Sequence, residues 1–159
     1  MTRSQTSMLA EPYVVAIAGA SGSGKSCLAE RLRDRLSATD GSQHVRMLCE
    51  DAYYRDRSDL TYEQRSGINY DHPDSLEHKL LVDHLDALRA GSAIEAPSYD
   101  YATHNRRTST ETIEPCRILL LEGILLLSQP AIRERCDLKL FVDVPLDVCL
   151  SRRVRRDVL

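Results

Sequence analysis

The amino-acid sequence predicts an α/β fold: a parallel sheet covered by helices on both faces, with a small antiparallel β insertion. Residues 19–26 read Gly-Ala-Ser-Gly-Ser-Gly-Lys-Ser and fit the phosphate-loop pattern G-x-x-x-x-G-K-[ST] at every fixed position. Strand-like apolar runs alternate with amphipathic segments over most of the chain. The segment 92–115 differs because it is rich in Thr and Tyr and punctuated by two prolines. Together these observations indicate a fold of the P-loop NTPase type.

The expected elements follow from periodicity and turn residues. Strands are expected over 13–18, 45–49, 117–122 and 138–142. Helices are expected over 25–37 with a turn at 40–41, from 71–74 to residue 90, over 129–135 and from Pro145 onward. The second helix would place leucines 76, 80, 81, 85 and 88 on one face, and a polar loop is expected over 52–72. The insertion 92–115 is expected to be a short antiparallel unit.

Length and composition predict one domain over 13–159 that follows a flexible tail, 1–12. The net charge of −3 gives no general basic character, so no nucleic-acid partner is expected. The longest apolar runs, 118–121 and 124–127, are too short to span a bilayer, so no membrane partner is expected. The five cysteines are odd in number and widely spaced without C-x-x-C, which favours a reduced, cytoplasmic location over a zinc site.

The phosphate loop predicts nucleotide binding at the turn between the first strand and the first helix. Glycine allows backbone conformations that turn the N–H groups toward phosphate oxygens, and the helix start adds partial positive charge. Lys25 can reach the outer phosphates, while the Ser26 hydroxyl can bind Mg²⁺. The alternative is a Gly/Ser-rich linker that matches by accident. The predicted nucleotide-binding residues are Gly19, Ala20, Ser21, Gly22, Ser23, Gly24, Lys25 and Ser26.

Two acidic residues follow predicted strands at the edge where ligands gather in parallel sheets. Glu122 ends a buried strand and is predicted to orient Mg²⁺; the alternative is a carboxylate that caps a local turn beside Gly123. Asp51 follows the second strand and is a candidate general base and second magnesium ligand. From the residues alone, a turn-capping or helix-capping aspartate is an equally good interpretation of Asp51.

Four arginines, 152, 153, 155 and 156, lie on the last predicted helix. Arg153 and Arg156 are three residues apart on one helix face, and they could clamp phosphates during transfer. A solvated helix face is the ordinary alternative, and RNA binding is weaker because no aromatic residues lie nearby in the sequence. His78 and His84 are six residues apart, a spacing that does not suit joint metal binding, so both are expected at the surface or the core edge.

The whole chain resembles the uridine kinase (uridine-cytidine kinase) family of bacteria. The collinear matching stretches are 19–26, Glu-Asp-Ala-Tyr-Tyr at 50–54, Asn-Tyr-Asp-His-Pro at 69–73, 97–104, Leu-Glu-Gly-Ile-Leu at 121–125, Phe-Val-Asp at 141–143 and 152–157. The resemblance implies transfer of the γ-phosphoryl group of ATP or GTP to the 5′-hydroxyl of uridine or cytidine, with Mg²⁺. It also suggests a homo-oligomer, specifically a tetramer.

The resemblance also implies residue roles. Asp51 corresponds to the catalytic base, and the magnesium site to Ser26, Asp51 and Glu122. Asp71 corresponds to the acid that binds the ribose hydroxyls. The pyrimidine would lie among Tyr54, Tyr70, Tyr99 and His104, although core packing is the alternative for Tyr70 and Tyr99 in particular. Arg153 and Arg156 correspond to arginines that contact the nucleoside and the phosphates.

One departure from the family pattern concerns the end of the chain. Family members continue through an arginine-bearing lid, a last strand and closing helices, so this chain is expected to be truncated relative to them. Two alternatives therefore stay open: a module that binds nucleotide with little kinase activity, and a kinase of another small alcohol, similar to phosphoribulokinase. A GTPase switch is disfavoured because the sequence holds neither Asp-x-x-Gly nor Asn-Lys-x-Asp.

Overall fold

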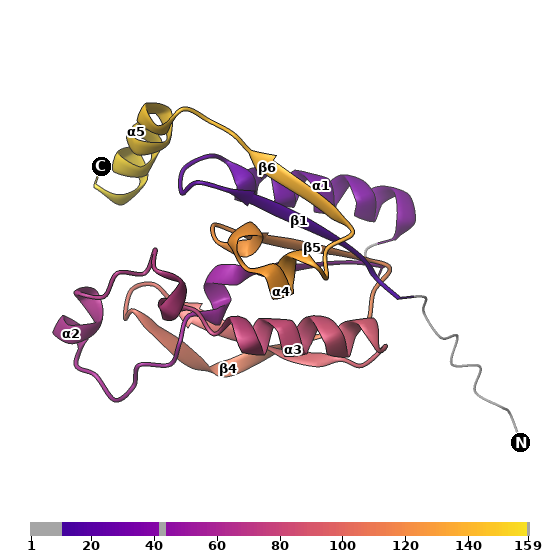
Figure 1. Cartoon of the computed structure of the whole chain (residues 1–159), viewed down its shortest axis with the longest axis horizontal. Helices are drawn as coiled ribbons and strands as arrows, with labels where there is room; N and C mark the ends of the chain where they lie inside the picture. Colours follow the sequence, from indigo (N-terminus) through magenta and orange to yellow (C-terminus); the bar gives the residue numbers. More distant parts are fainter. Residues whose placement is uncertain (1–10, 42–43, 159) are drawn as a thin grey trace, which may run out of the picture.

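The structure, a computed structural model, describes residues 11–41 and 44–158. Its centre is a parallel sheet of four strands in the order β2-β5-β1-β6 (Figure 1). These strands are β1 (Tyr13–Gly19), β2 (Val45–Cys49), β5 (Ile118–Gly123) and β6 (Leu138–Val142). All four strands were expected from the sequence. The expected tail 1–12 lies mostly outside the described residues, and Glu11 forms an ion pair with Arg89.

Alternating side chains give the sheet two apolar faces. Val15 and Ile17 of β1 face α1 (Lys25–Asp40), which packs on one side. Val14 and Ala16 face the opposite side, which is covered by α3 (His78–Arg89) and α4 (Pro130–Arg133) (Figure 1). The predicted parallel sheet with helices on both faces is therefore confirmed.

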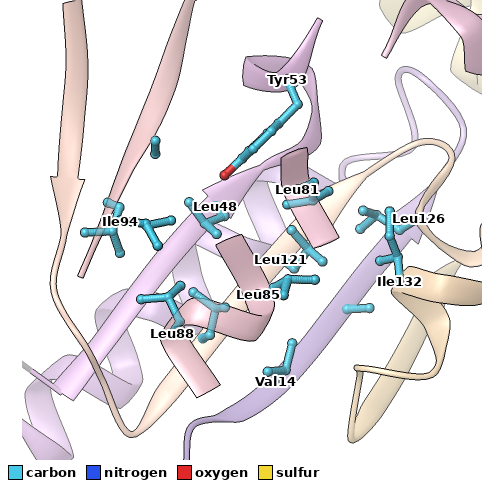
Figure 2. Packing of buried hydrophobic residues seen from close by; sticks show 14 of the residues in the cluster. Val14, Leu48, Tyr53, Leu81, Leu85, Leu88, Ile94, Leu121, Leu126 and Ile132 are labelled. Carbon is cyan, nitrogen blue, oxygen red and sulfur yellow. The ribbon is translucent and has the colours of Figure 1, made fainter. Parts of the chain in front are cut away.

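The larger part of the core lies between the sheet and α3. Buried leucines at positions 81, 85 and 88 of α3 pack with Leu48 of β2, Leu121 of β5 and Ile94 of the insertion (Figure 2). The insertion itself is the antiparallel pair of β3 (Ile94–Asp100) and β4 (Asn105–Ile113), as expected. β3 also packs against η2 (Glu50–Tyr53), a 3₁₀ turn directly after β2. The insertion thus lies beside the carboxyl end of the sheet.

The expected helix from 71–74 is wrong at its start. A separate 3₁₀ turn, η3 (Pro73–Ser75), is followed by Leu76, which is extended and forms a β-bridge with Tyr54. The sequence prediction included Leu76 because its spacing fits the helical series of leucines. Periodicity alone cannot show that the backbone leaves the helical conformation between two turns. Leu76 is buried by the strand-like pairing, and α3 begins two residues later.

The expected loop 52–72 also contains a short helix, α2 (Tyr62–Ser66). Thr61 and Gln64 form a capping box at its N-terminus, a signal that the sequence carries but that the loop interpretation missed. α1 continues three residues beyond the expected Ser37. The helix expected over 129–135 is shorter and follows another 3₁₀ turn, η4 (Leu126–Ser128). Apart from α2, these differences lie at element ends, where local hydrogen bonds decide the boundary.

The last helix, α5 (Leu146–Asp157), and the edge strand β6 carry exposed apolar side chains. Leu146, Leu150 and Val154 are spaced four residues apart on α5, and Phe141 of β6 is also exposed. β6 pairs with β1 on one side, and its other edge has no strand partner among the described residues. No helix in the described ranges is long and apolar enough to span a membrane.

Truncation of a buried leucine on α3 should destabilise the fold far more than truncation of an exposed one on α5. We expect Leu85→Ala to lower the free energy of unfolding by about 2–5 kcal/mol, because Leu85 is fully buried and leaves a cavity. The matched change Leu150→Ala removes the same atoms from an exposed site and should cost less than about 0.5 kcal/mol. Urea denaturation followed by circular dichroism measures both, and equal losses would contradict the assigned core.

Candidate functional site

A cavity of about 590 Å³ lies at the carboxyl ends of the sheet strands. Its walls come from the phosphate loop, the end of β2, the segment before η3, the β3–β4 hairpin, the end of β5 and α5. The lining residues are Ser21, Lys25, Ser26, Cys49, Asp51, Tyr54, Tyr70, Asp71, Tyr99, Tyr101, His104, Glu122, Ile124, Arg153, Arg156 and Asp157. Segments that are far apart in the sequence thus converge on one chamber.

The phosphate loop has the backbone that its glycines permit. Gly22 and Gly24 adopt φ angles of 84° and 93°, which side chains with a Cβ rarely adopt. A Cβ on Gly22 would also lie 2.5 Å from the carbonyl oxygen of Cys149, because α5 packs directly against the loop. Lys25 opens α1 and is largely buried, yet its side chain lines the cavity. The loop therefore presents a cation and the helix N-terminus to the chamber.

Arg152 holds the loop from the side of α5. Its guanidinium donates hydrogen bonds to the carbonyl oxygens of Gly22 and Ser23, at 3.4 and 3.2 Å. These bonds occupy carbonyls of the loop, and they tie its backbone to the last helix. The sequence pattern does not separate Arg152 from the other arginines of this helix, because helical spacing shows which face a residue shares but not which loop that face meets.

Asp51, Glu122 and Ser26 come together as expected. Ser26 Oγ donates a hydrogen bond to Glu122 Oε2 at 3.2 Å, and the Cys49 thiol donates to Glu122 Oε1 at 2.9 Å. Asp51 Oδ1 is buried and has no hydrogen-bond partner among the described residues. Burial raises the pKa of Asp51 to about 6, and the nearby Glu122 carboxylate adds to this, while Lys25 opposes it. The site thus holds a carboxylate of unusual proton affinity.

Glu50, directly before Asp51, is a fully buried carboxylate that sequence reasoning did not select. Its Oε1 lies 2.9 Å from His78 Nε2 of α3, and its Oε2 accepts a hydrogen bond of 2.8 Å from the Leu125 amide after β5. Gly123 leaves room for this carboxylate, since a Cβ there would overlap it. Glu50 therefore joins the end of β2 to α3 and to the exit of β5.

Four rings from three segments line the cavity and form an aromatic cluster: Tyr54, Tyr70, Tyr99 and His104. The Tyr70 and His104 rings stack with centroids 5.5 Å apart and planes 18° apart. The Tyr54 ring lies 5.1 Å from Tyr70 and 5.0 Å from Tyr99. Tyr54 and Tyr99 are also part of the buried core. Tyr54 and Tyr99 therefore both pack in the core and line the cavity, so the two interpretations of these residues do not exclude each other.

Charged side chains close the cavity between the aromatic cluster and α5. Arg153 Nη1 lies 3.5 Å from Asp71 Oδ2, and both side chains are about half exposed. Arg156 makes two hydrogen bonds to the neighbouring Asp157. Arg153 and Arg156, which share one face of α5, both line the same cavity as the phosphate loop.

The oxygen donors of the cavity suit a small hard cation. Ser26, Asp51 and Glu122 offer a hydroxyl and two carboxylates, and Mg²⁺ typically takes one or two carboxylates and keeps several waters. No group of three or more His, Cys, Asp or Glu residues that could hold a metal by itself occurs in the described ranges. The residues thus fit Mg²⁺ bound together with nucleotide phosphates better than a closed protein cage.

The predicted site residues converge, and the structure adds several that were missed. All predicted residues outside the loop line the cavity, and Ser21, Lys25 and Ser26 do so from the loop. Missed lining residues are Cys49, Tyr101, Ile124 and Asp157. Cys49 and Ile124 follow from the rule that ligands gather at strand ends. His78 and His84 both lie at the core edge, as expected. His84 Nδ1 is 2.9 Å from the Tyr53 hydroxyl, and burial lowers the pKa of His84.

Comparison with known proteins identifies related families and folds. A family profile described as "Phosphoribulokinase / Uridine kinase family" matches residues 14–159. Uridine kinases from Proteus mirabilis and Escherichia coli K12 are 51% and 48% identical over 145 residues, which cover 91% of this chain and 68% of each relative. A solved structure from Silicibacter sp. TM1040, provisionally described as a fructose transport system kinase, matches with a TM-score of 0.77 and 24% identity. The match covers 98% of this chain and 75% of that protein, and at this identity it shows the fold alone.

The raised pKa of Asp51 predicts that this carboxylate destabilises the folded chain at neutral pH. The native state binds the proton more tightly than the unfolded chain, so stability falls as the pH rises from the ordinary aspartate pKa of 3.8 to about 6 and stays lower above it. We expect Asp51→Asn to raise the free energy of unfolding at neutral pH by roughly 1–2 kcal/mol and to flatten this decline. The exposed control Asp59→Asn should change it by less than about 0.5 kcal/mol. Urea titrations across this pH range measure the free energy of unfolding. A lower value for Asp51→Asn than for the unaltered chain at neutral pH would contradict the prediction.

The space beside Gly123 predicts a second stability effect. Gly123→Ala should cost about 1–3 kcal/mol, because the added methyl group would displace the buried Glu50 carboxylate from His78 and the Leu125 amide. Gly67→Ala is the control, since its Cβ would meet its nearest atoms at 3.6 and 3.7 Å and its φ angle is ordinary. Thermal unfolding of both variants measures the difference. An unchanged midpoint for Gly123→Ala would show that Glu50 has room to move.

Proposed function

The chain belongs to the phosphoribulokinase / uridine kinase family, and on that basis we propose that it transfers the γ-phosphoryl group of ATP or GTP to the 5′-hydroxyl of uridine or cytidine. The products would be the nucleoside 5′-monophosphate and the nucleoside diphosphate, a step of pyrimidine salvage. Two named uridine kinases at about half identity support the substrate class.

The observation that carries the proposal is the position of Asp51. Its buried Oδ1, which has no hydrogen-bond partner in the described part of the chain, belongs to the same cavity as the phosphate loop and the aromatic cluster. A carboxylate with a pKa of about 6 is ionised at neutral pH and still has appreciable proton affinity. A hydroxyl group between the loop and the cluster would therefore meet both a phosphate donor and a base.

In the proposed reaction the 5′-oxygen attacks the γ-phosphorus in line, and the bond to the β–γ bridging oxygen breaks. The hydroxyl proton passes to Asp51, and the charge on the transferred group is stabilised by Lys25, Arg153 and Arg156. Mg²⁺, when bound at Ser26 and Glu122 with Asp51 as a further acid, would neutralise negative charge on the phosphates. The acidic wall of the cavity matches this requirement for a cation.

The acceptor end of the cavity favours a nucleoside over a simple small alcohol. Planar rings of Tyr70, His104 and their neighbours supply faces and edges for a pyrimidine, with the imidazole able to address the base edge. Asp71 can accept two hydrogen bonds from vicinal ribose hydroxyls, and its contact with Arg153 connects this end to the phosphate end. A tetrameric assembly and a cytoplasmic location stay predictions from the family resemblance.

Purified chain with Mg²⁺, ATP and uridine should form uridine monophosphate. Asp51→Asn should lower kcat by about 10²–10⁴-fold, since proton transfer to a positioned base is lost, while ATP binding is retained. Chromatographic product analysis measures turnover, and calorimetry measures ATP binding. Cytidine and GTP in parallel reactions would establish the range of acceptors and donors.

Three outcomes would contradict the proposal or the role that it gives to Asp51. Uridine-independent ATP hydrolysis with no bound uridine would indicate a nucleotide-binding module without nucleoside kinase activity. Phosphorylation of ribulose 5-phosphate or another small alcohol in preference to nucleosides would assign the scaffold to a different acceptor. Asp51→Asn that loses ATP binding together with turnover would remove Asp51 from the role of base.

A further inference from the structure

Cys49 is the last residue of β2 and pairs in register with Glu122 of β5. Partners in register on neighbouring parallel strands point their side chains to the same face of the sheet. This geometry places Cys49 Sγ 2.9 Å from Glu122 Oε1, while Ser26 Oγ lies 3.2 Å from Glu122 Oε2. Each oxygen of the Glu122 carboxylate thus has its own donor, from a different element.

The thiol restricts how the carboxylate can rotate. Glu122 is only 6% exposed, so little water reaches it to replace a missing donor. Among the described residues, Cys49 is the one hydrogen-bond donor to Oε1. With Oε1 held at the β2 side, Oε2 stays turned toward Ser26 and the phosphate loop. Donors of this kind, one shell behind a metal ligand, typically set its orientation.

We propose that Cys49 is a positioning residue for phosphoryl transfer: its thiol orients Glu122 so that this carboxylate and Ser26 meet Mg²⁺ together at the phosphate loop. The inference rests on the proposed function insofar as it assigns Mg²⁺ and nucleotide to the cavity. It adds a residue that acts through Glu122 and touches neither the nucleoside nor the phosphates in its proposed role.

The test compares how strongly Mg²⁺ tightens ATP binding in the unaltered chain and in its variants. Calorimetry gives the ATP dissociation constant with Mg²⁺ and with EDTA, and their ratio measures the coupling between metal and nucleotide. Cys49→Ala should reduce this ratio about 10-fold, because Glu122 Oε1 loses its donor. Cys49→Ser keeps a donor and should restore most of the ratio.

Cys116→Ala is the matched control, since Cys116 is also buried but lies before β5, at the opposite end of the sheet from the cavity. It should lose stability without changing the ratio. Equal ratios in the unaltered chain, Cys49→Ala and Cys49→Ser would overturn the inference, as would a serine variant that is no better than alanine. The inference would also be overturned if the unaltered chain bound ATP with the same dissociation constant in Mg²⁺ and in EDTA.

Formation of uridine monophosphate tests the proposed function separately. A chain that makes no uridine monophosphate but shows the expected pattern of ratios would reject the nucleoside acceptor and keep the role of Cys49. A chain that makes the product with unchanged ratios in Cys49→Ala would keep the kinase and reject the positioning role.

Discussion

The buried carboxylate of Glu50 is the constraint on which the geometry of the site depends. It occupies space that only glycine leaves at position 123, and its two oxygens meet His78 of α3 and the Leu125 amide. A buried charge is costly unless each lone pair finds a donor, so the three segments must keep their relative positions. Because Asp51 follows Glu50 directly in η2, the same contacts fix the backbone that carries the proposed base.

The opposite wall of the cavity is organised by α5. Arg152 on this helix holds two carbonyl oxygens of the phosphate loop, and Arg153 on the same helix contacts Asp71 at the acceptor end. Gly22 permits the close approach of helix and loop. One helix therefore contacts both ends of the chamber, so a shift of α5 would change the proposed donor and acceptor sites together.

Much of this arrangement follows from local sequence signals. The phosphate loop and the ends of β2 and β5 could be predicted because apolar runs mark buried strands and parallel strands bring their carboxyl ends to one edge. What could not be predicted depends on register and on which elements meet. Cys49 faces Glu122 only because β2 and β5 pair in one particular register, and Arg152 reaches the loop only because α5 packs there. The extended backbone at Leu76 was missed because its spacing also fits a helix.

The aromatic cluster has an optical consequence. The chain holds seven tyrosines and no tryptophan, so tyrosine dominates its near-ultraviolet emission. Four of the seven, at positions 54, 70, 99 and 101, line the cavity. Energy transfer to tryptophan, which masks tyrosine emission in most proteins, is absent here. Quenching by the base of the proposed nucleoside would therefore report on occupancy of the chamber in unlabelled protein, with Tyr13, Tyr53 and Tyr62 as the background from outside its lining.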